Sequence, residues 1–164
     1  MTNKTRTLVN CAVIAAIYAV VTVVFMPISY GLMQVRVSEA LTILPAFSPY
    51  ASFGLGIGCL IANILGGASI FDIVFGSLAT LVAGFLSYKL RKHKWLVPIP
   101  PIVLNAVVVG SLLCYVYEVG VSLPWCMLYV GVGEAISCYV FGMILYTILN
   151  KLPNKNKLFI GCDI

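Results

Sequence analysis

The charged residues of this chain are separated by uncharged runs that are long enough to cross a lipid bilayer. Asp, Glu, Lys and Arg are absent from residues 7–35, 40–71, 73–88, 95–117, 119–133 and 135–150. A helix needs about 20 apolar residues to cross a hydrocarbon core roughly 30 Å thick. Six helical crossings joined by short loops would therefore nearly exhaust the 164 residues.

The composition agrees with a lipid environment. The chain is 62% hydrophobic and 9% charged, whereas ordinary soluble domains are about 25% charged. A chain of this size exposes most of its residues at least partly, and ten basic with five acidic side chains cannot keep the rest in water. We therefore expect an all-α integral membrane protein and exclude a soluble globule.

The basic residues fall into three groups, and these groups predict the orientation. Lys4 and Arg6 precede the first uncharged run, four basic residues lie between positions 89 and 94, and three lie between positions 151 and 157. By the positive-inside rule the three segments are cytoplasmic, which requires an even number of spans. We expect a multi-pass protein of the cell membrane, with a transmembrane domain over residues 1–152 and a cytoplasmic tail over residues 153–164.

The predicted transmembrane helices are six, at about residues 8–28, 38–47, 51–65, 70–90, 101–117 and 124–149. The first is span-length and lacks a small-residue cleavage site, so we expect a retained helix, not a signal peptide. Pro45 and Pro49 separate the second helix from the third. Both are shorter than a full span and need neighbours or a cavity at their ends. This irregular backbone near the outer face indicates a binding site.

Small residues recur at intervals of four in the first helix, where Ala12 pairs with Ala16 and Ala15 with Ala19. This spacing lets membrane helices approach closely. The stripe is consistent with packing inside the chain or with docking onto a partner.

Four of the five acidic residues lie in or beside the predicted spans: Glu39, Asp72, Glu118 and Glu134. Glu134 lies near mid-membrane, where a charge costs about 3 kcal/mol, so we expect it to face a cavity or a partner. Arg36 and Glu39 are spaced i, i+3 and have the alternative of a structural ion pair. Asp72 and Glu118 lie near helix ends, where contact with interfacial water is the alternative.

Two amides, Asn63 and Asn105, also lie inside predicted spans, where they either line a site or join helices. Together with the acidic residues they describe an outward-facing pocket of net negative charge. A donor-rich or cationic aromatic solute suits such a pocket, because a carboxylate accepts two parallel N–H bonds from a guanine-like edge and a second carboxylate can pair with an amine.

Several functional classes lack their motifs. The sequence contains no GxxxxGK[ST] phosphate loop, HExxH motif or nucleophile constellation, and His93 lies alone in a basic loop. The six cysteines form no CxxC pair, which argues against a zinc site or a disulfide framework. We therefore expect that this chain is not an enzyme, that it has no catalytic or metal-binding residue, and that it binds neither a cofactor nor a nucleic acid.

Four parts of the sequence together carry a family resemblance. They are residues 34–45 (QVRVSEALTILP), 58–67 (GCLIANILGG) leading to 72–80 (DIVFGSLAT), 100–106 (PPIVLNA) and 131–139 (GVGEAISCY). They resemble the QueT proteins, which are substrate-binding S components of energy-coupling factor (ECF) transporters for queuosine precursors. The resemblance covers the chain up to about residue 152.

The resemblance implies an ECF S-component fold that captures a 7-deazaguanine, such as 7-aminomethyl-7-deazaguanine, from outside. It also implies a transmembrane coupling protein and two ATP-binding subunits as partners, which use ATP and drive toppling of the S component. The alanine stripe of the first helix is then the docking face, and residues 29–34 are a candidate lid.

For the site we expect Glu134 and Asn105 to contact the base edge, Arg36 and Glu39 to organise the pocket mouth, and Asp72 or Glu118 to pair with the aminomethyl cation. The alternatives are an S component for another vitamin or purine and, in a different class, a small channel or structural membrane subunit.

Overall fold

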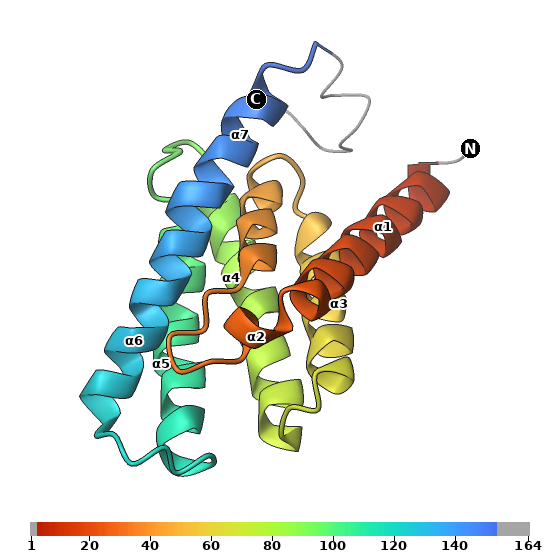
Figure 1. Cartoon of the computed structure of the whole chain (residues 1–164). Helices are drawn as coiled ribbons and strands as arrows, with labels where there is room; N and C mark the ends of the chain where they lie inside the picture. Colours follow the sequence, from red (N-terminus) through yellow and green to blue (C-terminus); the bar gives the residue numbers. More distant parts are fainter. Residues whose placement is uncertain (1–2, 154–164) are drawn as a thin grey trace.

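A computed structural model describes residues 3–153, and every regular element in that range is helical (Figure 1). In chain order the elements are α1 (Asn3–Val24), α2 (Met26–Ser29), the 3₁₀ helix η1 (Val37–Ala46), α3 (Ala51–Leu65), the π-helical η2 (Asp72–Gly76), α4 (Ser77–Lys89), α5 (Ile99–Tyr115), α6 (Leu123–Ala135), the π-helical η3 (Ile136–Gly142) and α7 (Met143–Asn150). η2 continues into α4, and α6, η3 and α7 form one continuous helix. The predicted tail falls outside this range except for its first residue.

Three of these helical segments are long and apolar enough to cross a membrane: Lys4–Val24, Asp72–Lys89 and Leu123–Asn150. Three shorter apolar helices, Val37–Ala46, Ala51–Leu65 and Ile99–Tyr115, coincide with the remaining predicted spans. Large apolar side chains are exposed along the outside of the bundle, for example Ile17 and Val107. The prediction of an all-helical integral membrane protein is confirmed.

The first helix ends earlier than the sequence predicted. α1 stops at Val24 and a separate short helix, α2, follows with Pro27 in its first turn. Proline has no N–H to continue the hydrogen-bond ladder of a helix, but it is well tolerated in the first turn of a new one. The predicted helix over residues 8–28 therefore divides in two.

α1 lies close against α3, because glycines of α3 face the backbone of α1. A Cβ on Gly54 would lie 2.8 Å from the carbonyl oxygen of Cys11, and one on Gly58 would lie 2.9 Å from that of Ala15. Side chains at these two positions would push the helices apart, so small residues fix the crossing. The main buried core forms here and includes Tyr18, Phe47 and Leu55.

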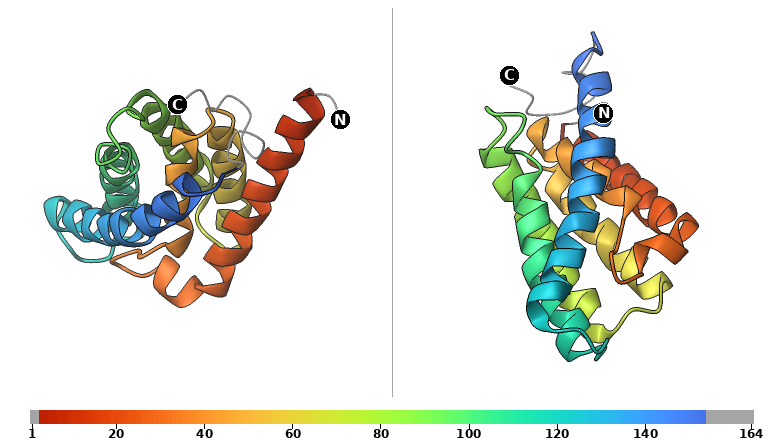
Figure 2. Two further views of the ribbon diagram at one scale, coloured as in Figure 1. Left: turned by 90° about the horizontal axis from the view of Figure 1, so that it is seen from above. Right: turned by 60° about the vertical axis from the view of Figure 1, so that its left-hand side comes forward.

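Different segments of the chain lie at the two ends of the bundle. The start of α1, the loop from α4 to α5 and the end of α7 lie at one end, and the loops 66–71 and 116–122 lie at the other (Figures 1 and 2). We call the second end the distal end. The first two basic segments and Lys151, the described part of the third, therefore lie at the end opposite to it.

Candidate binding site

A cluster of polar side chains is buried in the middle of the bundle, and we call it the central cluster. Its members come from α1, the segment before η1, η1 itself, α5, α6 and η3, and each is at most 2% exposed. They are Tyr18, Arg36, Glu39, Asn105, Glu134 and Cys138. The structure thus brings together four predicted site residues, Arg36, Glu39, Asn105 and Glu134, from four separate segments.

Glu134 is held on two sides. Its Oε1 accepts a hydrogen bond of 3.0 Å from Nδ2 of Asn105, and the thiol of Cys138 lies 3.9 Å from its Oε2. Cys138 follows four residues later on the same helix face, at the point where the helix becomes π-helical. π-Helical turns are frequent at functional sites.

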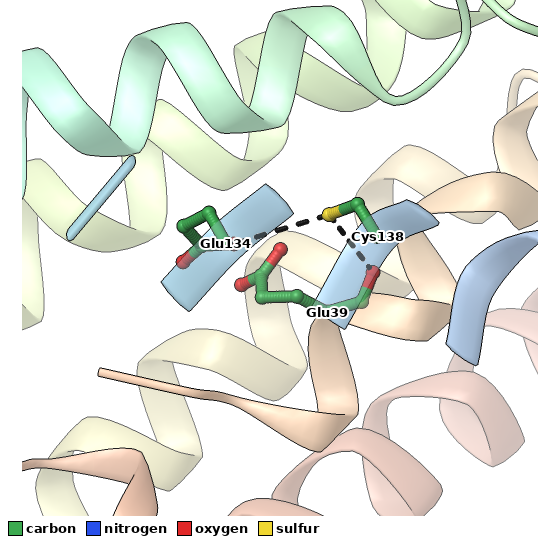
Figure 3. A group of neighbouring side chains, drawn as sticks. All are labelled: Glu39, Glu134 and Cys138. Atoms are coloured by element: carbon green, nitrogen blue, oxygen red, sulfur yellow. Dashed lines mark hydrogen bonds between the residues drawn. The ribbon is translucent and has the colours of Figure 1, made fainter. Parts of the chain in front are cut away.

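Glu39 faces Glu134 across the centre of the cluster, and Figure 3 shows the two side chains with Cys138 beside them. The Tyr18 hydroxyl donates a hydrogen bond to Oε1 of Glu39. The Cys138 thiol also lies 3.7 Å from the backbone oxygen of Glu39. The two carboxylates come from elements almost a hundred residues apart in the sequence, so only the folded bundle creates this pair.

Two acceptor oxygens in the central cluster lack a donor among the described residues: Oε2 of Glu39 and Oδ1 of Asn105. Both side chains are at most 1% exposed. A buried acceptor without a donor costs about 1–3 kcal/mol, and more if it is charged. The cluster is therefore short of hydrogen-bond donors, which a donor-rich ligand would provide.

Arg36 lies beside the carboxylates but binds other groups. Its Nε donates to the backbone oxygen of Ser29 at 3.3 Å, its Nη1 lies 3.9 Å from Sγ of Cys59, and its guanidinium lies over the ring of Tyr30. The charges of Glu39 and Glu134 act on it electrostatically. Arg36 thus offsets part of the negative charge and leaves acceptor oxygens of the carboxylates unused.

A second polar group lies at the distal end around Asp72. Oδ2 of Asp72 accepts a hydrogen bond of 2.6 Å from the Tyr117 hydroxyl, while its buried Oδ1 has no donor among the described residues. Burial and the bond to this carboxylate raise the pKa of Tyr117. Asn63 connects the two groups, since its Nδ2 donates to the backbone oxygen of Asp72 at 3.1 Å and lies 3.6 Å from Sγ of Cys59.

A cleft of about 250 Å³ opens at the distal end, between the loop that follows α2 and the loop that follows α5. We call it the distal cleft. Its lining comprises Tyr30, Gly31, Leu32, Gln34, Gly66, Gly67, Ala68, Leu113, Tyr117 and Val119. Four residues of the predicted lid, 29–34, therefore form one wall.

The remaining predicted residues lie apart from the central cluster. Glu118 is exposed on the loop after α5, with a positive φ of 46°. In the alanine stripe, Ala15 and Ala19 are buried, and Ala15 contacts α3, whereas Ala12 and Ala16 are exposed on the outside of α1. The surface that remains open for a partner is therefore the side of Ala12 and Ala16.

One group of side chains in residues 3–153 has the composition of a metal site. Glu39, Glu134 and Cys138 each offer a ligand atom, and these atoms lie within 4.8 Å of one another. The arrangement fits a divalent cation poorly, because the positive charge of Arg36 acts on both carboxylates and Tyr18 already donates to Glu39.

Sequence reasoning missed three residues that shape the central cluster. The sequence contains an indication of Cys138, because this residue lies four positions after Glu134 and therefore shares its helix face. The sequence contains no such indication of Tyr18 and Cys59, because apolar neighbours surround both. Only the packing of α1 and α3 brings them to Glu39 and Arg36.

A buried, donor-poor polar cluster inside a bundle of apolar helices, with a cleft at one end of the bundle, is an arrangement that suits a membrane protein that binds a solute. A family model described as "QueT transporter" matches residues 8–151, and the chain belongs to this family. The family is one of transporters rather than enzymes, with a small-molecule substrate.

A curated relative agrees with this assignment. The chain is 39% identical over 87 residues to a protein named queuosine precursor transporter QueT, from Lactococcus lactis subsp. cremoris (strain MG1363). The match covers 52% of this chain and 50% of the relative, so the chain spans about half the length of the curated relative that it matches. No solved structure matches the chain.

Proposed function

We propose that this protein is the substrate-binding S component of an ECF transporter and that it captures a 7-deazaguanine, such as 7-aminomethyl-7-deazaguanine, from outside the cell. The observation that carries the proposal is the donor shortage of the central cluster, where Oε2 of Glu39 and Oδ1 of Asn105 are buried without donors beside Glu134. A guanine-like edge brings an amide N–H and an amino group, which are the donors that such a cluster lacks.

In the proposed binding mode, Glu134 accepts the two parallel N–H bonds of the base edge. Asn105 holds the carboxylate in position through its bond of 3.0 Å. Glu39 and Asn105 accept further donors of the ring, and Arg36 stabilises the negative charge of the mouth. Bonds to a charged acceptor are roughly twice as strong as neutral ones, which favours a carboxylate for this contact.

Asp72 is the proposed partner of the aminomethyl cation. Of the two acids considered, Asp72 is 3% exposed with an unused oxygen, whereas Glu118 is exposed to the surroundings. Tyr117 fixes one carboxylate oxygen and leaves the other for the amine. Asn63 supports the backbone of Asp72 and is placed as a positioning residue in this proposal.

Asp72→Asn should distinguish two ligands. We expect the affinity for 7-aminomethyl-7-deazaguanine to fall about tenfold, because an ammonium loses its charged acceptor, which is worth about 1.5–3 kcal/mol. The affinity for 7-deazaguanine, which has no amine, should change less than about threefold. Isothermal titration of the purified protein measures both. Glu118→Gln is the matched control, and a selective loss of aminomethyl binding there would transfer the role to Glu118.

The proposed topology has six spans with both termini in the cytoplasm. It rests on the six apolar helical segments and on the basic residues of the described range at the start of α1, in the loop after α4 and at Lys151, which share one end of the bundle. The distal cleft then opens outward. Residues 1–152 form the transmembrane domain in this proposal, and the cytoplasmic tail follows.

The proposed partners are a transmembrane coupling protein and two ATP-binding subunits, which use ATP while this chain holds no cofactor. Docking uses the exposed side of α1 with Ala12 and Ala16, where small side chains permit close approach. Toppling would then turn the closed site toward the cytoplasm. A buried cluster under a lid suits this step, since unpaired polar groups are costly in lipid.

A binding titration tests two parts of the proposal together: the identity of the ligand and binding without a metal ion. Purified protein in lipid nanodiscs and excess EDTA should bind 7-aminomethyl-7-deazaguanine with submicromolar affinity, on the order of −8 kcal/mol or better. Adenine, which lacks the amide N–H beside an amino group, should bind at least about a hundredfold more weakly. Preferred binding of another vitamin from a panel, or binding that requires a divalent cation, would contradict the proposal.

A further inference from the structure

The segment from Ser29 to Arg36 forms one wall of the distal cleft and ends at Arg36 of the central cluster, and it touches one glycine of α6 and the glycine that caps α3. It leaves α2, crosses toward α6 and returns to η1, as Figures 1 and 2 show. Its contacts with α6 are made at Gly133, which directly precedes Glu134. A movement of this segment therefore acts next to the proposed base-binding carboxylate.

The contact at Gly133 is between backbone atoms. A Cβ at this position would overlap the carbonyl oxygen of Met33 and would lie 2.9 Å from its carbonyl carbon and 3.1 Å from that of Gln34. A backbone carbonyl cannot rotate away as a side chain can, so any residue larger than glycine displaces the segment. Gly131, on the same helix, has only Ala106 Cβ at 3.4 Å from such a Cβ.

A second contact, this time with a side chain of the segment, lies at the end of α3. A Cβ on Gly66 would overlap the ring and hydroxyl of Tyr30, whose hydroxyl donates to the backbone oxygen of Ala62 at 2.7 Å. The segment thus rests on one glycine from α6 and on one from the C-cap of α3. These contacts are far apart in the sequence. The contact at Gly133 requires the absence of a side chain, and a side chain at position 66 would displace the Tyr30 ring.

Arg36 joins the two ends of the segment. Its Nε donates to the Ser29 oxygen and its guanidinium lies 5.2 Å from the centroid of the Tyr30 ring. Between these points Gln34 adopts a positive φ of 43°, a conformation that a residue with a Cβ rarely adopts. The closed segment therefore contains a strained residue between two points that Arg36 contacts.

We propose that Gly133 and Gly66 are positioning residues of a substrate gate: they are the seats on which residues Ser29–Gln34 close, and the closed gate controls how fast a ligand leaves the central cluster. The proposal rests on the proposed function for the identity of the ligand. The closure itself rests only on the contacts of the segment.

The first test needs no ligand. Hydrogen–deuterium exchange of the amides of residues 29–36 should rise at least about tenfold in Gly133→Ala, because the Met33 carbonyl loses its seat. Gly131→Ala should exchange as the natural protein does. Unchanged exchange in Gly133→Ala would overturn the gate, whatever the ligand is.

The second test measures exit of labelled 7-aminomethyl-7-deazaguanine in nanodiscs. Gly133→Ala should increase the dissociation rate about tenfold while the association rate changes less than about threefold, since an open gate affects escape most. Equal dissociation rates in Gly133→Ala and Gly131→Ala would contradict the gate. Raised exchange in a protein that binds no deazaguanine would instead contradict the proposed function and leave the gate supported.

Gly66→Ala keeps the proposal testable if Gly133→Ala does not fold. It should also raise the exchange of residues 29–36, because its Cβ displaces the Tyr30 ring. The double variant Gly66→Ala/Tyr30→Ala should exchange no faster at residues 29–36 than Tyr30→Ala alone, because without the Tyr30 ring the Cβ at position 66 has nothing to displace. A full additive effect of the two changes would overturn the assignment of Gly66 as a seat.

Discussion

Glu134→Gln should lower the affinity for 7-aminomethyl-7-deazaguanine by at least about a hundredfold, which corresponds to about 3 kcal/mol. The glutamine has nearly the same shape, and its oxygen can still accept the bond from Asn105 that holds the carboxylate at 3.0 Å. Its amide NH₂ then replaces an acceptor by a donor, so one of the two parallel bonds to the base edge becomes a contact between donors. Isothermal titration in nanodiscs measures the loss.

The matched control for Glu134→Gln is Glu118→Gln, which removes the same charge from an exposed loop position. We expect less than a twofold change there, because exposed charges contribute little at this range. A comparable melting temperature of the two ligand-free variants would show that the loss concerns binding and not folding. Equal affinity of Glu134→Gln and the natural protein would remove Glu134 from the site.

The helices could be predicted closely because charge and proline mark their limits. The third span, 51–65, coincides with α3 (Ala51–Leu65) at both ends, and the last span, 124–149, differs from Leu123–Asn150 by one residue at each end. Charged groups are excluded from hydrocarbon so strongly that their positions along a chain limit where a span can lie. The ending of α1 before Pro27 is a local effect that the hydrophobic pattern does not contain.

The site could be predicted as a set of residue types and less well as an arrangement. Polar groups are costly inside a membrane, so the positions of Glu134 and Asn105 within apolar runs predict a site, and the structure shows the two hydrogen-bonded to each other. The contacts of Tyr18 with Glu39 and of Arg36 with Cys59 depend on how helices far apart in the sequence cross. The periodicity of residues within one helix does not predict how that helix crosses another.

The alanine stripe of α1 shows the same limit. A repeat at i, i+4 identifies a line of small residues, but the line does not say which neighbour it faces. Gly54 and Gly58 of α3 draw α1 close, which buries Ala15 and Ala19 and leaves Ala12 and Ala16 exposed. The structure therefore assigns Ala15 and Ala19 to packing inside the chain, and docking onto a partner stays a proposal for Ala12 and Ala16.

Ala16→Trp should abolish uptake while it leaves ligand binding intact. Ala16 is exposed on the side of α1 that we propose to dock onto the coupling protein, and an indole there would separate two closely packed helices at a cost of about 1–3 kcal/mol or more. We expect transport of labelled 7-aminomethyl-7-deazaguanine into cells to fall at least about tenfold, with titrated affinity within about twofold. Val107→Trp, on the exposed face of α5, is the control and should transport normally. Because the substitution lies outside the central cluster, loss of binding and loss of transport are separable, and normal transport by Ala16→Trp would exclude this face of α1 as the docking surface.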